Sequence, residues 1–515
     1  MFSRLLGLPA QRQSRLLSVL LGLLFAASAA LLLFHAAVWT HYAFSVLGYP
    51  FDLDYEGPLL AQVRRLQLGR SLYPPIGAAP YVVTNYTPLY VLSTWLLSGL
   101  GIDALLAGRA LSLAATFTIA TLIANVVHRL SPDADPATRR IAAGFAALLF
   151  LCNLYVEQWG VNMRVDMLAI GLELCGLWLY LFAPAGRQLW LAAPFLVLAV
   201  YTKQTAIAAA AACLATSLLR DRREALRLAL LVCVPAATIL LIALLATEGQ
   251  FWQHHVRANM NAYSAAYAAS QLVEMLQLNG FAIAIGATVA LPALAGLRAL
   301  RTSGGTQPLP PPGPLTTLAL YWLAGFAVSL AIGKVGSNIN YFIEWIAANC
   351  VLFGLALTRP PLPALGRLPL RSLVVVLAFA AQGLVSATYC SWTLGQTNPA
   401  AQDVAIRRGE RLVAELRAVE GIVLSEDMTL LYRAEKNLFY QPFEMTQLAY
   451  QQVWDPTPVI RLLRERRIPC IVLTEPLAKA DPGRFLPAML DAIRSGYVLQ
   501  QRVGGWYVYV PGGGA

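Results

Sequence analysis

The chain has 515 residues, of which 58% are hydrophobic and 13% are charged, about half the charged share of an ordinary soluble protein. Residues 1–400 carry 24 Lys/Arg and 14 Asp/Glu, whereas residues 401–515 carry 14 and 13. The first part is too poor in charge to form a water-exposed surface, which excludes a soluble multidomain protein. The composition predicts an all-α polytopic membrane domain at 1–390 and a small soluble α/β domain at 391–515.

The net charge of +11 lies almost entirely in the membrane part. Positively charged loops on one side of a membrane account for it, so it does not indicate a nucleic-acid partner. Most cysteines lie inside apolar runs, where they behave as small core residues. Cys390 and Cys470 are the only plausible disulfide pair, and no Cys/His spacing resembles a zinc site.

The first apolar run, Leu16 to Val38, is long enough to cross a bilayer and longer than the core of a signal peptide. We expect it to be an uncleaved first span with a cytoplasmic N-terminus. Further spans are predicted at about 104–127, 141–157, 167–183, 190–219, 226–246, 280–297, 315–333, 341–358 and 371–390. With short or re-entrant helices, about 11 membrane helices result.

Arginine clusters between these runs orient the spans. Sixteen of the 24 basic residues of the membrane part fall in such clusters, and placing all of them in the cytoplasm satisfies the positive-inside rule. The segment 391–515 then lies outside the cytoplasm. Its strand-like runs at 421–426, 470–475 and 506–510 alternate with helical patterns at 404–419 and 458–467, which is typical of an α/β domain.

Two segments do not fit simple spans. The run 190–219 has arginines at both ends and Lys203 in its middle, which favours two short helices that meet near Lys203. The run from Pro88 to Leu100 is too short to cross a membrane and indicates a half-helix. Broken helices occur in membranes where they line a protein-enclosed or wet cavity, so both predict an outward-opening cavity.

The first outward loop, residues 39–87, contains three closely spaced carboxylates, Asp52, Asp54 and Glu56. All three share a face of an extended segment, and Asp52 and Glu56 share one in a helix. Either arrangement requires a raised pKa, a bound cation or a basic partner. Residues 58–69 interleave apolar residues with arginines, as in a helix lying at a membrane interface. The alternative for the acids is an ordinary solvated loop.

Other charged residues interrupt apolar runs or stand at their ends. Arg164 and Asp166 precede the span 167–183, Lys203 breaks the run 190–219, and Lys334 and Glu344 flank a segment that contains Asn340. Charges at membrane depth are costly and usually face a cavity. The alternative is a structural ion pair, such as Arg164 with Asp166. Lys203 has no acidic neighbour nearby in the sequence.

A later outward segment, at about 248–270, contains His254, His255 and Arg257 together with asparagines and tyrosines. These side chains could line a sugar or phosphate site, or they could be ordinary interfacial residues.

The order of these motifs resembles the GT-C membrane glycosyltransferases, within them the family 39-type protein-mannosyltransferases and bacterial aminoarabinose transferases. The resemblance covers roughly residues 15–390. Its motifs are DLDYEG, LxxGRSLY, NYTPLY, RVDMLAIGL, YTKQT and NINYFIEW. It implies a multi-pass enzyme of the bacterial plasma (inner) membrane. Such an enzyme moves a hexosyl or pentosyl group from a polyprenyl-phosphate donor to a lipid, glycan or protein acceptor at the outer face, with inversion.

The resemblance places a first-loop acid at the catalytic centre, here Asp52 or Asp54, and a divalent metal in some members, for which Asp54 and Glu56 are the candidates. A departing lipid phosphate needs fixed cations. The candidate cations are Lys203, Arg164, Lys334 and Arg257. The further substrate-binding candidates are Glu56, Asp166, His254, His255, Tyr86, Asn340 and Glu344.

Two other functions remain open. Intramembrane charges and broken helices also occur in transporters and lipid flippases, although we find no duplicated half here. A non-catalytic assembly or sensor protein would tolerate Asp52→Asn and Asp54→Asn. The transferase interpretation requires the first-loop acids and Lys203 to converge on one outward cavity.

Overall fold

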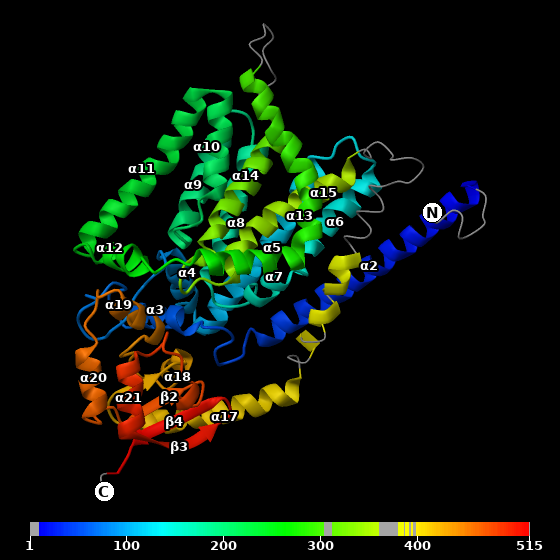
Figure 1. Cartoon of the computed structure of the whole chain (residues 1–515). Coiled ribbons are helices and arrows are strands. Elements are labelled where there is room, and N and C mark those ends of the chain that lie inside the picture. Colours follow the sequence, from blue (N-terminus) through cyan, green and yellow to red (C-terminus); the bar gives the residue numbers. More distant parts are fainter. Residues whose placement is uncertain are drawn as a thin grey trace.

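The computed structural model describes residues 10–302, 312–359, 380–385, 387–390, 393–394 and 398–513. It consists of a helical bundle, with a small domain of mixed helices and strands packed at one end (Figure 1). The bundle helices are α2 (Ala10–Val46), α5 (Ala104–Arg129), α6 (Pro136–Leu151), α8 (Val165–Phe182), α9 (Gln188–Thr202), α10 (Ala208–Arg220), α11 (Arg222–Ala246), α13 (Ala265–Thr302), α14 (Pro314–Ser329) and α15 (Ile343–Thr358).

Seven helices of the described residues are long and apolar enough to cross a membrane, and three shorter apolar helices accompany them. The chain is therefore a multi-pass membrane protein. The predicted span 141–157 is divided between α6 and a short α7 (Leu154–Trp159), and α13 begins well before the predicted 280. The last predicted span, 371–390, lies mostly outside the described residues, so the total of 11 membrane helices stays a prediction.

Burial within the bundle separates its centre from its periphery. In an 18-residue window of the segment Ile339–Thr358, which includes η3 (Ile339–Phe342) and α15, 83% of the window is buried inside the protein, whereas the share for α11 is 6%. Because α11 is apolar on all sides, its exposed surface suits contact with lipid tails. In Figure 1, α2 runs along the edge of the bundle.

The predicted break at Lys203 is present. Helix α9 ends at Thr202, and α10 begins at Ala208. Near the start of α8, Asp166 contacts Lys203, whereas Tyr180 near its end contacts Ser217 of α10. The two short helices therefore descend and return beside α8, with Lys203 at the apex. The predicted half-helix is α4 (Leu89–Ser98).

The C-terminal domain contains a four-stranded sheet in the order β1 (Val423–Ser425), β2 (Cys470–Leu473), β4 (Trp506–Pro511) and β3 (Tyr497–Val503). The β1–β2 pair is parallel and the other two pairs are antiparallel. The helices of the domain are α17 (Pro399–Ala418), α18 (Met428–Arg433), α19 (Pro442–Tyr450), α20 (Thr457–Arg464), η4 (Leu477–Lys479) and α21 (Pro487–Gly496).

This domain confirms the predicted α/β pattern and three of its strands. Its boundary at residue 391 stays a prediction. Cys390 and Cys470, the only plausible disulfide pair of the sequence, are both buried free thiols.

Helix α3 (Gly57–Gln67) lies between the bundle and the C-terminal domain. Its side chains Leu59, Leu60 and Val63 are at most 2% exposed and pack on α4 and α5. The opposite side meets α18, where a Cβ added to Gly57 would lie 2.7 Å from the Cβ of Met428. Protein therefore covers this part of the apolar face, and the expected position of the helix at a membrane interface stays a prediction.

Candidate functional site

The acidic motif forms a tight turn between α2 and α3. The backbone N–H of Glu56 donates to Asp52 Oδ1 at 2.7 Å, and the N–H of Leu53 donates to Glu56 Oε2 at 3.0 Å. Tyr55 has a φ of 53°, in the left-handed region. The motif is thus neither extended nor helical, because each acid accepts a hydrogen bond from the backbone near the other.

Arg109 of α5 anchors this turn. Its guanidinium is completely buried and forms an ion pair with Glu56, with Nε donating to Oε1 at 2.9 Å. It also donates to the carbonyls of Val46, Tyr49 and Phe51. The same Glu56 Oε1 accepts from the backbone N–H of Met163 at 2.6 Å. Both oxygens of Glu56 are therefore committed to holding the turn.

Asp52 and Asp54 line a pocket whose other wall belongs to the C-terminal domain, which contributes Glu426, Asp427 and Arg484. Burial, then the nearby charges of Asp427 and Glu56, raise the pKa of Asp52 well above its ordinary value. Burial also raises the pKa of Asp54, and Arg164 and Arg484 oppose that rise.

The C-terminal wall is held by its own hydrogen bonds. Asp427 precedes α18 and accepts from the backbone N–H of Thr429 at 2.9 Å and from the indole of Trp506 at 3.0 Å. Tyr55 donates its hydroxyl to Glu444 of α19 at 2.9 Å, and its ring lies under the Arg484 guanidinium at 5.5 Å.

Arg164 connects the acidic turn to the charged end of α8. Its Nη1 donates to the Tyr55 carbonyl at 2.8 Å. Two residues further on, Asp166 Oδ1 accepts from Lys203 Nζ at 2.7 Å and from Asn340 Nδ2 at 2.7 Å. Lys203 also lies 4.3 Å from the centre of the Tyr341 ring. The alternative considered from the sequence, an ion pair of Arg164 with Asp166, is not formed, and Asp166 pairs with Lys203 instead.

A small cavity lies beside this ion pair. Asp166, Lys203, Asn340 and Glu344 line it together with Glu173, which the sequence analysis did not select. Lys334 donates to Asn259 at 3.4 Å, and burial together with the nearby charge of Lys203 acts to lower its pKa. The charges of Arg164, Asp166 and Lys203 also act on the side chain of Tyr86.

The remaining candidates lie elsewhere. Arg257, in η1 (Arg257–Asn259), is exposed and donates to Gln253. His254 and His255, at the end of α12 (Gln250–His255), are buried. His254 accepts from the Thr84 N–H and contacts the Pro74 carbonyl. Burial lowers the pKa of His254 to about 4 and that of His255 to about 3. None of the three lines the pocket of Asp52 or the cavity of Lys203.

The donor set does not fit the expected metal at Asp54 and Glu56. Both Glu56 oxygens already accept hydrogen bonds, and Asp54 alone supplies too few ligands for a dedicated cation site. Across the part of the chain that the structure describes, no cluster of three or more His, Cys, Asp or Glu side chains could hold a metal ion.

Arg109, Asp427, Glu444 and Arg484 are site residues that sequence reasoning missed. A signal existed for Arg109, which is a lone charge inside the predicted span 104–127. The other three lie in the C-terminal domain, more than 370 residues from the acidic turn, and no local pattern marks them.

The arrangement of membrane helices, acidic first loop and appended α/β domain is the GT-C fold of membrane glycosyltransferases. Solved structures with this fold include ArnT from Cupriavidus metallidurans bound to undecaprenyl phosphate, with a TM-score of 0.60 and 14% identity over 94% of this chain and 98% of that one. The apo structure of the same enzyme gives a TM-score of 0.58 and 15% sequence identity, with the same coverage of both chains.

A second neighbour is the archaeal oligosaccharyltransferase AglB from Archaeoglobus fulgidus, in complex with an inhibitory peptide and a dolichol-phosphate. It gives a TM-score of 0.50 and 12% identity over 93% of this chain and 74% of that one. No family model matches the sequence, and no curated protein is significantly similar to it in sequence. At these identities the likeness establishes the fold.

Proposed function

We propose that the protein transfers a sugar from a polyprenyl-phosphate donor to an acceptor hydroxyl, with inversion at the anomeric carbon. Asp52 and Asp54 line one pocket and Lys203 lines a separate cavity, so among the described residues the single cavity expected from the sequence is not present. The observation that carries the proposal is the connection between the two: Arg164 donates to the Tyr55 carbonyl in the acidic turn and stands two residues before Asp166, the partner of Lys203. The undecaprenyl phosphate bound to ArnT and the dolichol-phosphate bound to AglB, whose fold this chain shares, support a lipid-phosphate donor.

The two acids take different roles in this proposal. Asp52, whose pKa is raised by burial and by Asp427, is the general base that accepts the acceptor's proton. Asp54 is exposed in the pocket and lies near Arg164 and Arg484, which favour its ionised form. It stabilises the positive charge that develops on the sugar ring in an oxocarbenium-like transition state.

The cations stabilise the leaving group. As the bond between the anomeric carbon and the phosphate oxygen breaks, negative charge accumulates on the lipid phosphate. Lys203 and Arg164 are fixed in place by Asp166 and by the Tyr55 carbonyl, so little reorganisation is needed when that charge appears. Lys334 is a further candidate, since it lies within the electrostatic reach of Lys203.

The acceptor enters the pocket between the acidic turn and the C-terminal domain. Arg408 and Arg484 line this pocket opposite the acids. Its lining combines these charged groups with apolar side chains such as Leu53, Val404 and Trp506, as suits a lipid, glycan or protein acceptor that presents a hydroxyl group. We place the protein in a bacterial plasma membrane, with the N-terminus in the cytoplasm and this pocket outside.

The test is release of bare lipid phosphate. Purified protein in lipid nanodiscs is incubated with a panel of hexosyl and pentosyl polyprenyl phosphates, and free polyprenyl phosphate is measured. We expect release from at least one donor, and its loss in Asp52→Asn and in Asp54→Asn. A transporter would move a donor across the bilayer without releasing lipid phosphate, and equal release by both variants and the wild type would refute the assignment.

A further inference from the structure

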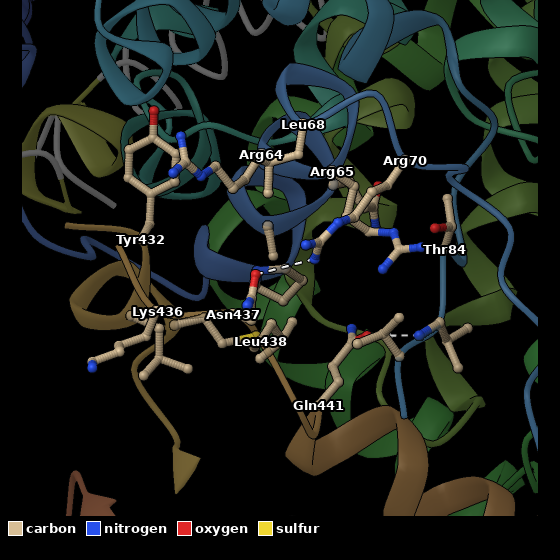
Figure 2. Close-up of a pocket in the computed structure, with 17 residues that line it drawn as sticks. Arg64, Arg65, Leu68, Arg70, Thr84, Tyr432, Lys436, Asn437, Leu438 and Gln441 are labelled. Atoms are coloured by element: carbon tan, nitrogen blue, oxygen red, sulfur yellow. Dashed lines mark hydrogen bonds between the residues drawn. The ribbon is translucent and has the colours of Figure 1, made fainter. Parts of the chain in front are cut away.

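A second pocket lies between α3 and the C-terminal domain, and we call it the α3–α18 pocket (Figure 2). Four of its lining residues are cations, namely Arg64, Arg65, Arg70 and Lys436, and none is an acid. It shares no lining residue with the pocket of Asp52 or with the cavity of Lys203. The proposed sugar-transfer site therefore does not account for these four cations.

Among the residues that the structure describes, Arg65 and Arg70 have neutral hydrogen-bond partners. Arg65 donates to the Ser71 carbonyl at 2.8 Å, and Arg70 donates to the Asn437 side-chain oxygen at 3.1 Å. Burial and the charge of Arg70 lower the pKa of Arg65. In Figure 2, the Arg65 and Arg70 side chains lie in the space between Asn437 and Thr84, and a dashed line joins the Arg70 guanidinium to Asn437. Two guanidinium groups that line one pocket repel each other, and an anion bound between them removes the repulsion.

A buried amide adds a second, independent observation. Gln62 lines the same pocket and is 4% exposed, yet neither its amide nitrogen nor its amide oxygen has a hydrogen-bond partner in the part of the chain that the structure describes. A buried polar group without a partner costs free energy. A bound oxyanion would accept the unused amide N–H.

One edge of the pocket is apolar and exposed. Leu68 lines the pocket and is 42% exposed. The neighbouring Gln67 donates to Ser98 at the end of α4 at 3.3 Å, and next to that end Leu96 and Leu100 are 62% and 77% exposed. A cationic pocket bordered by exposed apolar side chains suits a ligand with an anionic head and an apolar tail.

We propose that the α3–α18 pocket binds a phosphate group, supplied by a membrane-lipid headgroup or by soluble phosphate, independently of the sugar-transfer site. Planar guanidinium groups bind phosphate oxygens through paired, charge-assisted hydrogen bonds, and Arg65 and Arg70 supply two such groups. Gln62 adds a neutral donor. Because α3 begins directly after Glu56, a ligand bound here would also stabilise α3 and with it the position of the acidic turn.

The test measures binding to the purified full chain in detergent, by calorimetry. The probes are short-chain phosphatidylglycerol, short-chain diacylglycerol without phosphate, and inorganic phosphate. The variants are Arg65→Gln/Arg70→Gln and the matched control Arg461→Gln, an exposed arginine of α20 outside the pocket. All are compared in the wild-type and in the Lys203→Gln background, which removes a cation of the donor site. The single variants serve if thermal unfolding shows that the double variant is misfolded.

We expect the wild type to bind phosphatidylglycerol, the paired variant to bind it at least about tenfold more weakly, and Arg461→Gln to behave as the wild type, in both backgrounds. Competition by inorganic phosphate would show that the phosphate group alone is recognised. If inorganic phosphate does not bind, the phosphate group is supplied by a lipid headgroup. Equal binding of diacylglycerol, an equal loss in Arg461→Gln, no loss in the paired variant, or no binding by the wild type would overturn the proposal.

Discussion

Asp52 is the most strongly perturbed acid among the first-loop candidates, because it is partly buried and the charges of three other carboxylates, Asp427, Glu56 and Asp54, act on it. Glu56 of its own turn is neutralised by Arg109, but Asp427 approaches from the C-terminal domain without a basic partner among the described residues. Burial and these charges disfavour the ionised form of Asp52 and raise its pKa. In the proposed mechanism the base must be ionised, so the rate falls as the pH drops through this raised pKa.

Asp427→Asn removes one of the charges that raise the pKa of Asp52. The pKa should fall toward its ordinary value, so the acidic limb of the plot of kcat/KM against pH should move to lower pH. Asp403→Asn, an exposed acid of α17 outside the pocket, is the control and should leave the limb in place. A limb that does not move in Asp427→Asn, or that moves to higher pH, would contradict the assignment of Asp52 as the base.

At the scale of elements, the break between α9 and α10 positions Lys203. The backbone turns at the apex of the two helices, and the ammonium group reaches Asp166 of α8. The two charged side chains are only 9% and 1% exposed. Such a pair is costly to break, because the remaining charge is left buried without its partner.

Lys203→Met should therefore destabilise the protein by about 3–5 kcal/mol and weaken donor binding. In the double variant Lys203→Met/Asp166→Asn, no unpaired charge remains, and we expect thermal stability to recover while donor affinity stays low. Thermal unfolding and donor binding of the purified variants separate the two effects. Recovery of both in the double variant would assign Lys203 to structure alone.

Helices and strands could be predicted where a short stretch of sequence determines them. The charge of Lys203 inside an apolar run predicted the break in the helix, and the length of the run after Pro88 predicted α4. Strand β3 was missed, because it is an edge strand whose apolar run, Tyr497 to Leu499, is only three residues long before the polar Gln500, Gln501 and Arg502. For α3 the sequence predicted an amphipathic helix at the membrane interface but not its packing on α4 and α5, because an amphipathic pattern does not reveal whether lipid or protein covers the apolar face.

The site as a whole was only partly predictable, since its pairs join distant parts of the chain. The sequence marked Lys203 and Asp166 separately, but not their contact across 37 positions. Tyr55 and Glu444 are 389 positions apart. Tertiary packing alone determines such pairs, so the C-terminal wall of the pocket could not be inferred from the first-loop motif.

At the scale of the molecule, the C-terminal domain completes the candidate site. Two close contacts fix it against the turn: Gly409 of α17 packs on the Phe51 ring so tightly that an added Cβ would lie 2.2 Å from that ring, and Tyr55 donates to Glu444. The same Tyr55 holds Arg164 through its carbonyl. The orientation of the acids therefore depends on both parts of the protein.

Tyr55→Phe removes the hydroxyl that joins the turn to α19. We expect kcat to fall severalfold with little change in the KM for the donor, and stability to fall by about 1 kcal/mol, the usual contribution of one hydrogen bond. Tyr450→Phe loses only an exposed bond to the Pro482 carbonyl and is the matched control. Equal kinetics for the two variants would show that the C-terminal domain does not orient the acids.

The most direct test of the account is the position of a bound lipid phosphate. Electron cryomicroscopy of the protein in nanodiscs with added polyprenyl phosphate would locate its phosphate group. The account predicts the phosphate within about 4 Å of Lys203 or Arg164, the usual limit of an ion pair, on the side that faces Asp52 and Asp54. A phosphate bound away from both cations, or separated from the acids by the body of the bundle, would contradict it.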